Sequence, residues 1–375
     1  MRNNDYCNMK PYELIAVVQP GLEKMAEKEL RELGYNDLRI IRGGILLKGH
    51  QSTIMKLNLA CRCISRVLIG LAEFKAKSFA ELETELEQIP WQDYLKDQNI
   101  CIRVTSRQSS LYHERAIEER LLATLSCVLG KTISFVGSPD EENTQLIVIH
   151  ARHDVFSVRL DTSGAHLHKR GYGLYKEDAP LRETVAAAFL KKIGWSENIF
   201  CLCDPLCGSG TIPLEATVMA ARIPLCEFRQ FSFQKWPSFQ PEVFVKIRQT
   251  FMDKMIQQPK VKILASDLDA KAVNSAIANA QSAGVDKLIQ FARADLKNLH
   301  IDKNYIVVTN PPWGKRMDSS QIKNIWMKLH SIVKCGSKVY LVLAENQISE
   351  FRYKFKTLLR FTAGEMKLRF IKLEA

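Results

Sequence analysis

The stretch IFCLCDPLCGSGTIPLEATVMAAR, residues 199–222, decides the fold of the second half of the chain. It begins with an apolar run, turns at a glycine-containing segment and continues with apolar residues at helical spacing. This order predicts a buried strand, a tight turn and a helix. Gly208 and Gly210 allow the turn to bend sharply and bring its backbone close to a ligand. Units of this kind occur in doubly wound folds that bind nucleotides.

The alternation of strand and helix continues on both sides of this stretch. The predicted strands cover 199–205, 261–267, 288–295, 305–312 and 338–346, and the predicted helices cover 181–195, 211–222, 269–284 and 321–334. Apolar strands that alternate with helices predict an α/β fold, a doubly wound sheet covered on both faces. The tail, residues 361–375, predicts a hairpin that adds an antiparallel edge.

The first half of the chain mixes short strands and amphipathic helices without strict alternation, which predicts an α+β region. Its first unit contains a strand at 12–18, a helix at 21–34 and a hairpin around Gly43 and Gly44. A second unit of similar type begins near Phe74. We therefore expect three domains, at residues 1–72, 73–165 and 166–375.

Composition restricts the partners and the compartment. Lys and Arg number 53 against 41 Asp and Glu, a formal charge of +12, which fits a polyanionic partner as well as a generally basic surface. Ten cysteines are scattered through apolar runs, and the closest group, Cys201, Cys203 and Cys207, lacks metal-ligand spacing. Neither a leader nor a membrane span is visible, so we expect a cytoplasmic protein without a metal or a membrane partner.

The turn DPLCGSGT, Asp204–Thr211, predicts a cofactor site, because the following helix offers free N–H groups to a carboxylate. A dinucleotide site would need a third glycine, but Pro213 occupies that position. Asp267 ends the next strand, where a nucleotide's ribose hydroxyls need an acceptor, and Asp295 ends the third, where it can accept from an adenine amine. Each aspartate alone could be an ordinary helix cap. Together they predict S-adenosylmethionine as the cofactor.

The fourth strand ends in NPPW, residues 310–313. Paired prolines also punctuate ordinary loops, but this motif lies where a doubly wound sheet binds its ligands. The Asn310 side-chain oxygen and the Pro311 carbonyl can both accept from an aromatic NH₂ and orient its lone pair. Trp313 offers a flat surface for a base. The motif therefore predicts methyl transfer to an exocyclic amine of a nucleobase.

DPLCGSGT followed by NPPW resembles the amino-methyltransferases, a class I, Rossmann-like family in which NPPY is the commoner motif. LRETVAAAFL is similar to the helix that these enzymes place against the methionyl end of the cofactor, which implies a contact from Thr184. FRQFSFQKWPSF resembles an insertion in a subfamily with THUMP domains. PGLEKMAEKEL, VTSRQSSLYHERAIEERL and VRLDTSGAHLHKRGY resemble the ferredoxin-like and THUMP parts of its RNA-binding region.

This resemblance covers nearly the whole chain and implies a bacterial guanine-N2 RNA methyltransferase. The cofactor-binding residues it implies are Thr184, Asp204, Gly208, Gly210, Asp267 and Asp295, and the catalytic residues are Asn310, Pro311 and Trp313. Ribosomal RNA of the large subunit is the expected substrate, with transfer RNA as the alternative. A DNA adenine-N6 methyltransferase and a non-catalytic RNA-binding factor are further alternatives, since NPPW serves any exocyclic amine.

Overall fold

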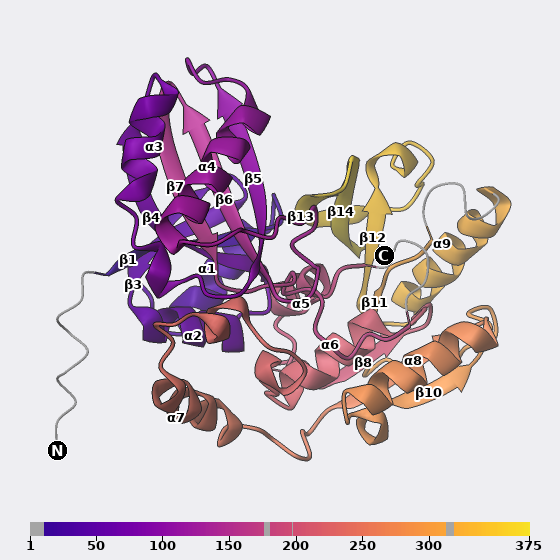
Figure 1. Cartoon of the computed structure of the whole chain (residues 1–375). Helices are drawn as coiled ribbons and strands as arrows, with labels where there is room; N and C mark the ends of the chain where they lie inside the picture. Colours follow the sequence, from indigo (N-terminus) through magenta and orange to yellow (C-terminus); the bar gives the residue numbers. More distant parts are fainter. Residues whose placement is uncertain (1–10, 176–180, 197, 313–318) are drawn as a thin grey trace.

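The computed structural model describes residues 11–175, 181–196, 198–312 and 319–375. These residues form two seven-stranded sheets, one in each half of the chain. In Figure 1 the N-terminal sheet lies at the upper left and the C-terminal sheet at the right, with helices α5 (Glu183–Ile193) and α6 (Thr211–Ala220) between them. No helix in the described ranges is both long and apolar enough to cross a membrane.

The N-terminal sheet has the strand order β2-β3-β1-β4-β7-β6-β5. Its strands are β1 (Tyr12–Val18), β2 (Arg39–Ile41), β3 (Gly44–Gly49), β4 (Ile64–Lys75), β5 (Asn99–Arg107), β6 (Thr144–Arg152) and β7 (Val155–Asp161). Its helices are α1 (Glu23–Glu32), α2 (Gln51–Ala60), α3 (Phe79–Glu87) and α4 (Glu114–Leu129). The strand predicted at 12–18, the helix predicted at 21–34 and the hairpin at Gly43 and Gly44 are confirmed as β1, α1 and the pair β2 and β3. A further strand expected at residues 132–137 is wrong, because only an isolated bridge from Phe135 to Ile100 forms there. The elements α2, β4 and α3 were not predicted.

The long strand β4 joins the two α+β units that the sequence predicts. It pairs with β1 on one side and with β7 on the other, both antiparallel. The two units therefore share one continuous sheet, and the boundary predicted at residue 72 falls inside β4.

The C-terminal sheet has the strand order β10-β9-β8-β11-β12-β14-β13. Its strands are β8 (Cys201–Asp204), β9 (Lys262–Asp267), β10 (Gln290–Arg293), β11 (Ile306–Thr309), β12 (Val339–Ala344), β13 (Phe355–Ala363) and β14 (Met366–Leu373). The first five strands pair in parallel, and β14 pairs antiparallel with both β12 and β13. The predicted doubly wound, Rossmann-like sheet and its antiparallel edge are therefore confirmed.

Alternate side chains of each central strand enter two different clusters of buried residues. Leu202 and Val308 belong to a large core that extends into the N-terminal half, whereas Cys203 and Val307 pack in a second cluster with Trp326. Trp326 lies on α9 (Ser319–Lys334). Because neighbouring residues of a strand point to opposite faces, both faces of this sheet are covered, as in other doubly wound folds.

The segment between α6 and β9 returns to the N-terminal half. Its helix α7 (Pro241–Met252) packs against α2 (Figure 1). The Ser232 hydroxyl and the Trp236 indole N–H both donate to the Gln145 side-chain oxygen at 2.8 Å, and all three residues are buried. Helix α8 (Ala270–Ser282) follows β9.

Candidate active site

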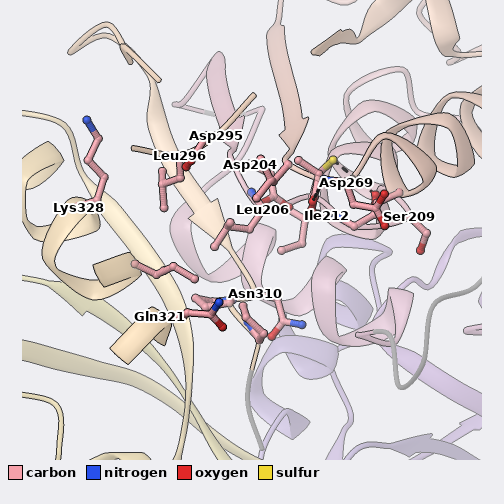
Figure 2. Close-up of a pocket in the computed structure, with 18 of the residues that line it drawn as sticks. Asp204, Leu206, Ser209, Ile212, Asp269, Asp295, Leu296, Asn310, Gln321 and Lys328 are labelled. Carbon is pink, nitrogen blue, oxygen red and sulfur yellow. Dashed lines mark hydrogen bonds between the residues drawn. The ribbon is translucent and has the colours of Figure 1, made fainter. Parts of the chain in front are cut away.

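A cavity of about 650 Å³ lies where β8, β9, β10 and β11 end, a volume in the range of sites that hold drug-sized ligands. β8 has β9 on one side and β11 on the other, so the strand order reverses there. Ligands of doubly wound sheets bind in the crevice at such a point. The polar lining residues discussed below are Asp204, Asp267, Asp269, Asp295, Lys297, Asn310, Gln321, Asn324 and Lys328. Figure 2 shows Asp204, Asp269 and Asp295 in the upper part of the view, Asn310 and Gln321 below them, and Lys328 at the left.

The glycine-containing turn forms one wall of the cavity. Gly208 and Gly210 have φ angles of +53° and +89°, which favour glycine over residues with a side chain. A Cβ atom on Gly210 would lie 2.8 Å from the Leu214 side chain and 3.0 Å from that of Ala276. Gly210 therefore allows α6 to begin close against α8, and Thr211 and Ile212, the first two residues of α6, line the cavity.

Hydrogen bonds hold this turn against the end of β9. The Gly208 N–H donates to Asp267 Oδ2 at 3.0 Å, and the Cys207 N–H donates to the Ser266 carbonyl at 2.9 Å. Asp267 Oδ1 accepts from the Asp269 N–H at 3.0 Å. Asp269 in turn caps α8 by accepting from the Lys271 N–H. The backbone thus orients Asp267 at the cavity wall.

Asp204 is the most deeply buried carboxylate of the cavity, with 2% of its surface exposed. Its Oδ1 accepts from the Thr309 hydroxyl at 2.7 Å and from the Leu206 N–H at 3.2 Å. Burial raises the pKa of Asp204 to about 7, although both hydrogen bonds lower it. Asp204 therefore changes its charge near neutral pH.

The motif residues Asn310, Pro311 and Pro312 follow β11 and line the same cavity as the aspartates. Asp295 follows β10, and its carboxylate accepts from the Lys297 N–H at 2.9 Å. The structure thus brings together the ends of four strands that are far apart in the sequence. Trp313 lies outside the described residues.

Thr184 stands apart from the other predicted site residues. It lies in the first turn of α5, is 1% exposed, and does not line the cavity, which Leu181 reaches instead. Its hydroxyl is buried without a hydrogen-bond partner among the described residues. A contact between Thr184 and the cofactor stays a prediction.

One wall of the cavity was not predicted from the sequence. Gln321, Asn324, Ile325 and Lys328 line it from one face of α9. They follow the helical spacing of i, i+3, i+4 and i+7, so they share a face. This spacing is the only sequence pattern that could have indicated these cavity-lining residues, and it is equally typical of an ordinary solvated helix.

The residues of the cavity fit S-adenosylmethionine. The carboxylates of Asp204, Asp267 and Asp295 could accept hydrogen bonds from its ammonium, hydroxyl and amine groups, and the N-terminus of α6 could donate to its carboxylate. The apolar side chains of Leu268 and Leu296 can flank a flat base. Among the described residues, no group of three His, Cys, Asp or Glu side chains could hold a metal ion.

Fold and site together define an S-adenosylmethionine-dependent methyltransferase. A family model described as an RMKL-like methyltransferase domain, UPF0020, matches residues 170–357, and a second, the RlmL ferredoxin-like domain, matches residues 13–68. The chain belongs to the UPF0020 methyltransferase family.

Two relatives extend these matches beyond the catalytic half. YpsC of Bacillus subtilis (strain 168), whose name describes an RNA methyltransferase, is 31% identical over 82% of this chain and 81% of its own length. The ribosomal RNA large subunit methyltransferase K/L of Psychromonas ingrahamii is 31% identical over 80% of this chain. That match covers 41% of the K/L protein, so the chain spans about two fifths of this longer relative.

Two solved structures resemble the whole chain. SMU.472 is described as a methyltransferase and was crystallised with S-adenosylhomocysteine (SAH), the demethylated form of the cofactor. It has a TM-score of 0.84 and 26% identity, covering 98% of this chain and 99% of its own. A Listeria monocytogenes protein described as an N6-adenine-specific DNA methylase has a TM-score of 0.82 and 29% identity. That comparison covers 99% of this chain and 98% of the other. The complex of SMU.472 with SAH supports the cofactor predicted from the sequence.

Proposed function

We propose that the protein transfers a methyl group from S-adenosylmethionine to the exocyclic N2 amine of a guanine in RNA. Ribosomal RNA of the large subunit is the proposed substrate, and transfer RNA is the alternative. The observation that carries the proposal is the presence of Asn310 and Pro311 in one cavity with Asp204, Asp267 and Asp295.

The proposed catalytic residues act on the acceptor amine. An aromatic amine is a poor nucleophile because its lone pair is delocalised into the ring. The Asn310 side-chain oxygen and the Pro311 carbonyl would each accept one amine hydrogen, which steers the nitrogen toward tetrahedral geometry and takes its lone pair out of conjugation with the ring. The bound cofactor supplies an activated methyl group on its sulfonium, so the site needs orientation more than a strong base.

The names of the relatives support RNA as the substrate. YpsC carries the name of an RNA methyltransferase, and K/L that of a ribosomal RNA methyltransferase. Residues 13–68 of this chain match the RlmL ferredoxin-like domain. A formal charge of +12 also fits a polyanionic substrate.

Guanine N2 rests on resemblance, since the amines of adenine and cytosine present the same two hydrogens to Asn310. The THUMP-like N-terminal sequence and the insertion FRQFSFQKWPSF, residues 228–239, support guanine in RNA. A paired guanine would have to leave its partner before both amine hydrogens could be bound. A guanine in or beside a loop or bulge is therefore the proposed target.

The described function of the Listeria structure favours a second candidate, adenine N6 in DNA. A direct test is to incubate the protein with methyl-labelled cofactor and unmodified ribosomal RNA, transfer RNA or DNA, and then to digest each to nucleosides. Label in N2-methylguanosine from ribosomal RNA is the expected result. Label in N2-methylguanosine from transfer RNA alone would support guanine-N2 methylation but make transfer RNA the substrate. Label in N6-methyladenosine or only in DNA would overturn the proposal, and no label in any of the three would favour a non-catalytic role.

A further inference from the structure

A buried hydrogen bond connects the two motifs of the active site. β8 and β11 are neighbours in the sheet, with Leu202 opposite Ile306 and Cys203 opposite Val307. At their carboxyl ends the Thr309 hydroxyl donates to Asp204 Oδ1 at 2.7 Å. Thr309 is fully buried and Asp204 is 2% exposed, so little water competes for this bond.

Each partner is directly connected to one half of the reaction site. Asp204 is the first residue of the DPLCGSGT turn, and Asp267 at the end of β9 holds Gly208 of the same turn. Thr309 is the last residue of β11 and is covalently joined to Asn310. The Thr309 side chain is therefore a short connection between the carboxylate proposed to hold the cofactor and the amide proposed to hold the acceptor amine.

We propose that Thr309 is a positioning residue, whose hydroxyl fixes the Asp204 carboxylate relative to Asn310 and so aligns the cofactor with the acceptor amine. The inference rests on the proposed roles of Asp204 and Asn310. It does not depend on which nucleobase is methylated.

The hydrogen-bond pattern of Asp204 supports this role. Among the described residues, the Thr309 hydroxyl and the Leu206 N–H donate to this carboxylate, and both bind the same oxygen, Oδ1. Together they fix the rotation of the carboxyl group, and the other oxygen, Oδ2, accepts no hydrogen bond from the residues that the structure describes. The oxygen proposed to accept from the cofactor ammonium is therefore held in a fixed position before the cofactor binds, as in preorganised sites.

Two pairs of variants separate positioning from simple packing. Thr309→Val keeps the shape of the side chain but loses the hydroxyl, whereas Thr309→Ser keeps the hydroxyl but loses the methyl group. If the residue acted only by filling space, the serine variant would be the more defective. A role of the hydrogen bond predicts the opposite order. Thr309→Ala provides a further comparison with Thr309→Ser, because both lack the methyl group.

Binding of SAH provides a readout that needs no acceptor. SAH carries the α-ammonium group, so its affinity should rise as Asp204 ionises between about pH 6 and pH 8. The Thr309 hydroxyl stabilises the ionised form, and without it the midpoint of this rise should move to higher pH. The other charged residues that line the cavity, and that any shift must be compared with, are Asp267, Asp269, Asp295, Lys297 and Lys328.

The experiment is calorimetric titration of SAH into the full chain and its variants across this pH range. Turnover is measured in addition, with the nucleic acid that takes up most label in the test described above. We expect the valine variant to lose about 10- to 100-fold in kcat and to shift the midpoint, with the serine variant within about threefold of wild type. A serine variant as defective as valine, or an unchanged midpoint in both, would overturn the inference. If the valine variant does not fold, the alanine variant must show the same loss relative to serine. An unsuitable acceptor would remove turnover in all variants, including wild type, but leave the SAH titrations interpretable.

Discussion

Arg170 Nε donates to Glu215 Oε1 at 2.8 Å, and both side chains are fully buried. The same carboxylate oxygen accepts from the Tyr172 hydroxyl at 2.6 Å, and Arg170 Nη2 donates to the Arg62 carbonyl at 2.9 Å. Glu215 lies on α6, and Arg62 precedes β4, so this network connects the helix after the cofactor turn with the N-terminal sheet.

Glu215→Ala should therefore destabilise the whole chain. The change leaves the buried Arg170 guanidinium without its carboxylate, which typically costs about 3–5 kcal/mol. Urea unfolding followed by circular dichroism measures the loss. The control is Glu119→Ala, which breaks the exposed pair between Arg115 and Glu119 and should leave the unfolding midpoint unchanged. Equal midpoints for both variants would contradict a structural role of the buried network.

Asp204 should make the stability of the cofactor-free protein depend on pH. Its pKa is raised to about 7 in the folded chain and is about 4 in an unfolded one, so folding favours the protonated form. The stabilising contribution of protonated Asp204 is complete below pH 4 and is lost as the pH rises to about 7. Melting temperatures of wild type and Asp204→Asn should therefore diverge over this range, with wild type losing more. Parallel curves from pH 4 to pH 8 would show that Asp204 titrates normally.

Gly210→Ala should reduce cofactor affinity through crowding at the start of α6. The new Cβ would lie 2.8 Å from the Leu214 side chain, and the turn would have to move. Gly336→Ala is a matched control, because its φ of +99° is equally unfavourable but no atom lies within 4 Å. Both variants should lose about 1–2 kcal/mol of stability from the backbone conformation. Only Gly210→Ala should weaken SAH binding in calorimetry, and equal binding by the two would exclude crowding as the cause.

Asn279 should support the cofactor turn from behind. Its side chain donates to the Ser209 carbonyl at 3.1 Å and to the Tyr175 carbonyl at 3.0 Å, and it accepts from the N–H groups of Leu174 and Tyr175. Asn279→Ala leaves buried groups unpaired, which costs about 1–3 kcal/mol, and should also weaken SAH binding. Asn274→Ala on the exposed side of α8 tests the helix without these bonds and should change neither quantity.

Asn310→Ala should separate turnover from cofactor binding. The proposed contact of Asn310 is made to the acceptor amine and matters most in the transition state, so kcat should collapse while SAH affinity stays nearly unchanged. Single-turnover kinetics and calorimetry measure the two quantities. A variant that binds SAH poorly but turns over normally at saturation would assign Asn310 to the cofactor instead.

The catalytic half could be predicted from the sequence because its information is local. Each buried strand is a short apolar run, and parallel strands place their carboxyl ends at one edge, so Asp204, Asp267, Asp295 and Asn310 could be expected to meet. The hydrogen bond from Thr309 was not predicted. Thr309 ends an apolar strand, and its partner is identified only by the side-by-side pairing of β8 and β11.

The N-terminal half was predicted less completely for a different reason. Helix α2 is buried on most sides because α7 packs against it, so its sequence, QSTIMKLNLA, lacks a clear division into apolar and polar faces. Likewise, β4 connects the two α+β units through pairings with β1 and β7. Such long-range pairings leave no periodic signal within β4 itself.

The bonds from Ser232 and Trp236 to Gln145 have a consequence for how the two halves stay together. The polypeptide passes from the first half to the second, and the insertion at residues 228–239 then contacts the first half again. After a single break in the backbone between the sheets, the two fragments would therefore still be connected by the hydrogen bonds to the buried Gln145 side chain and by the packing of α7 on α2. The covalent connection is therefore only one of several links between the halves. If the two halves are encoded as separate, co-expressed genes, we expect the two polypeptides to associate.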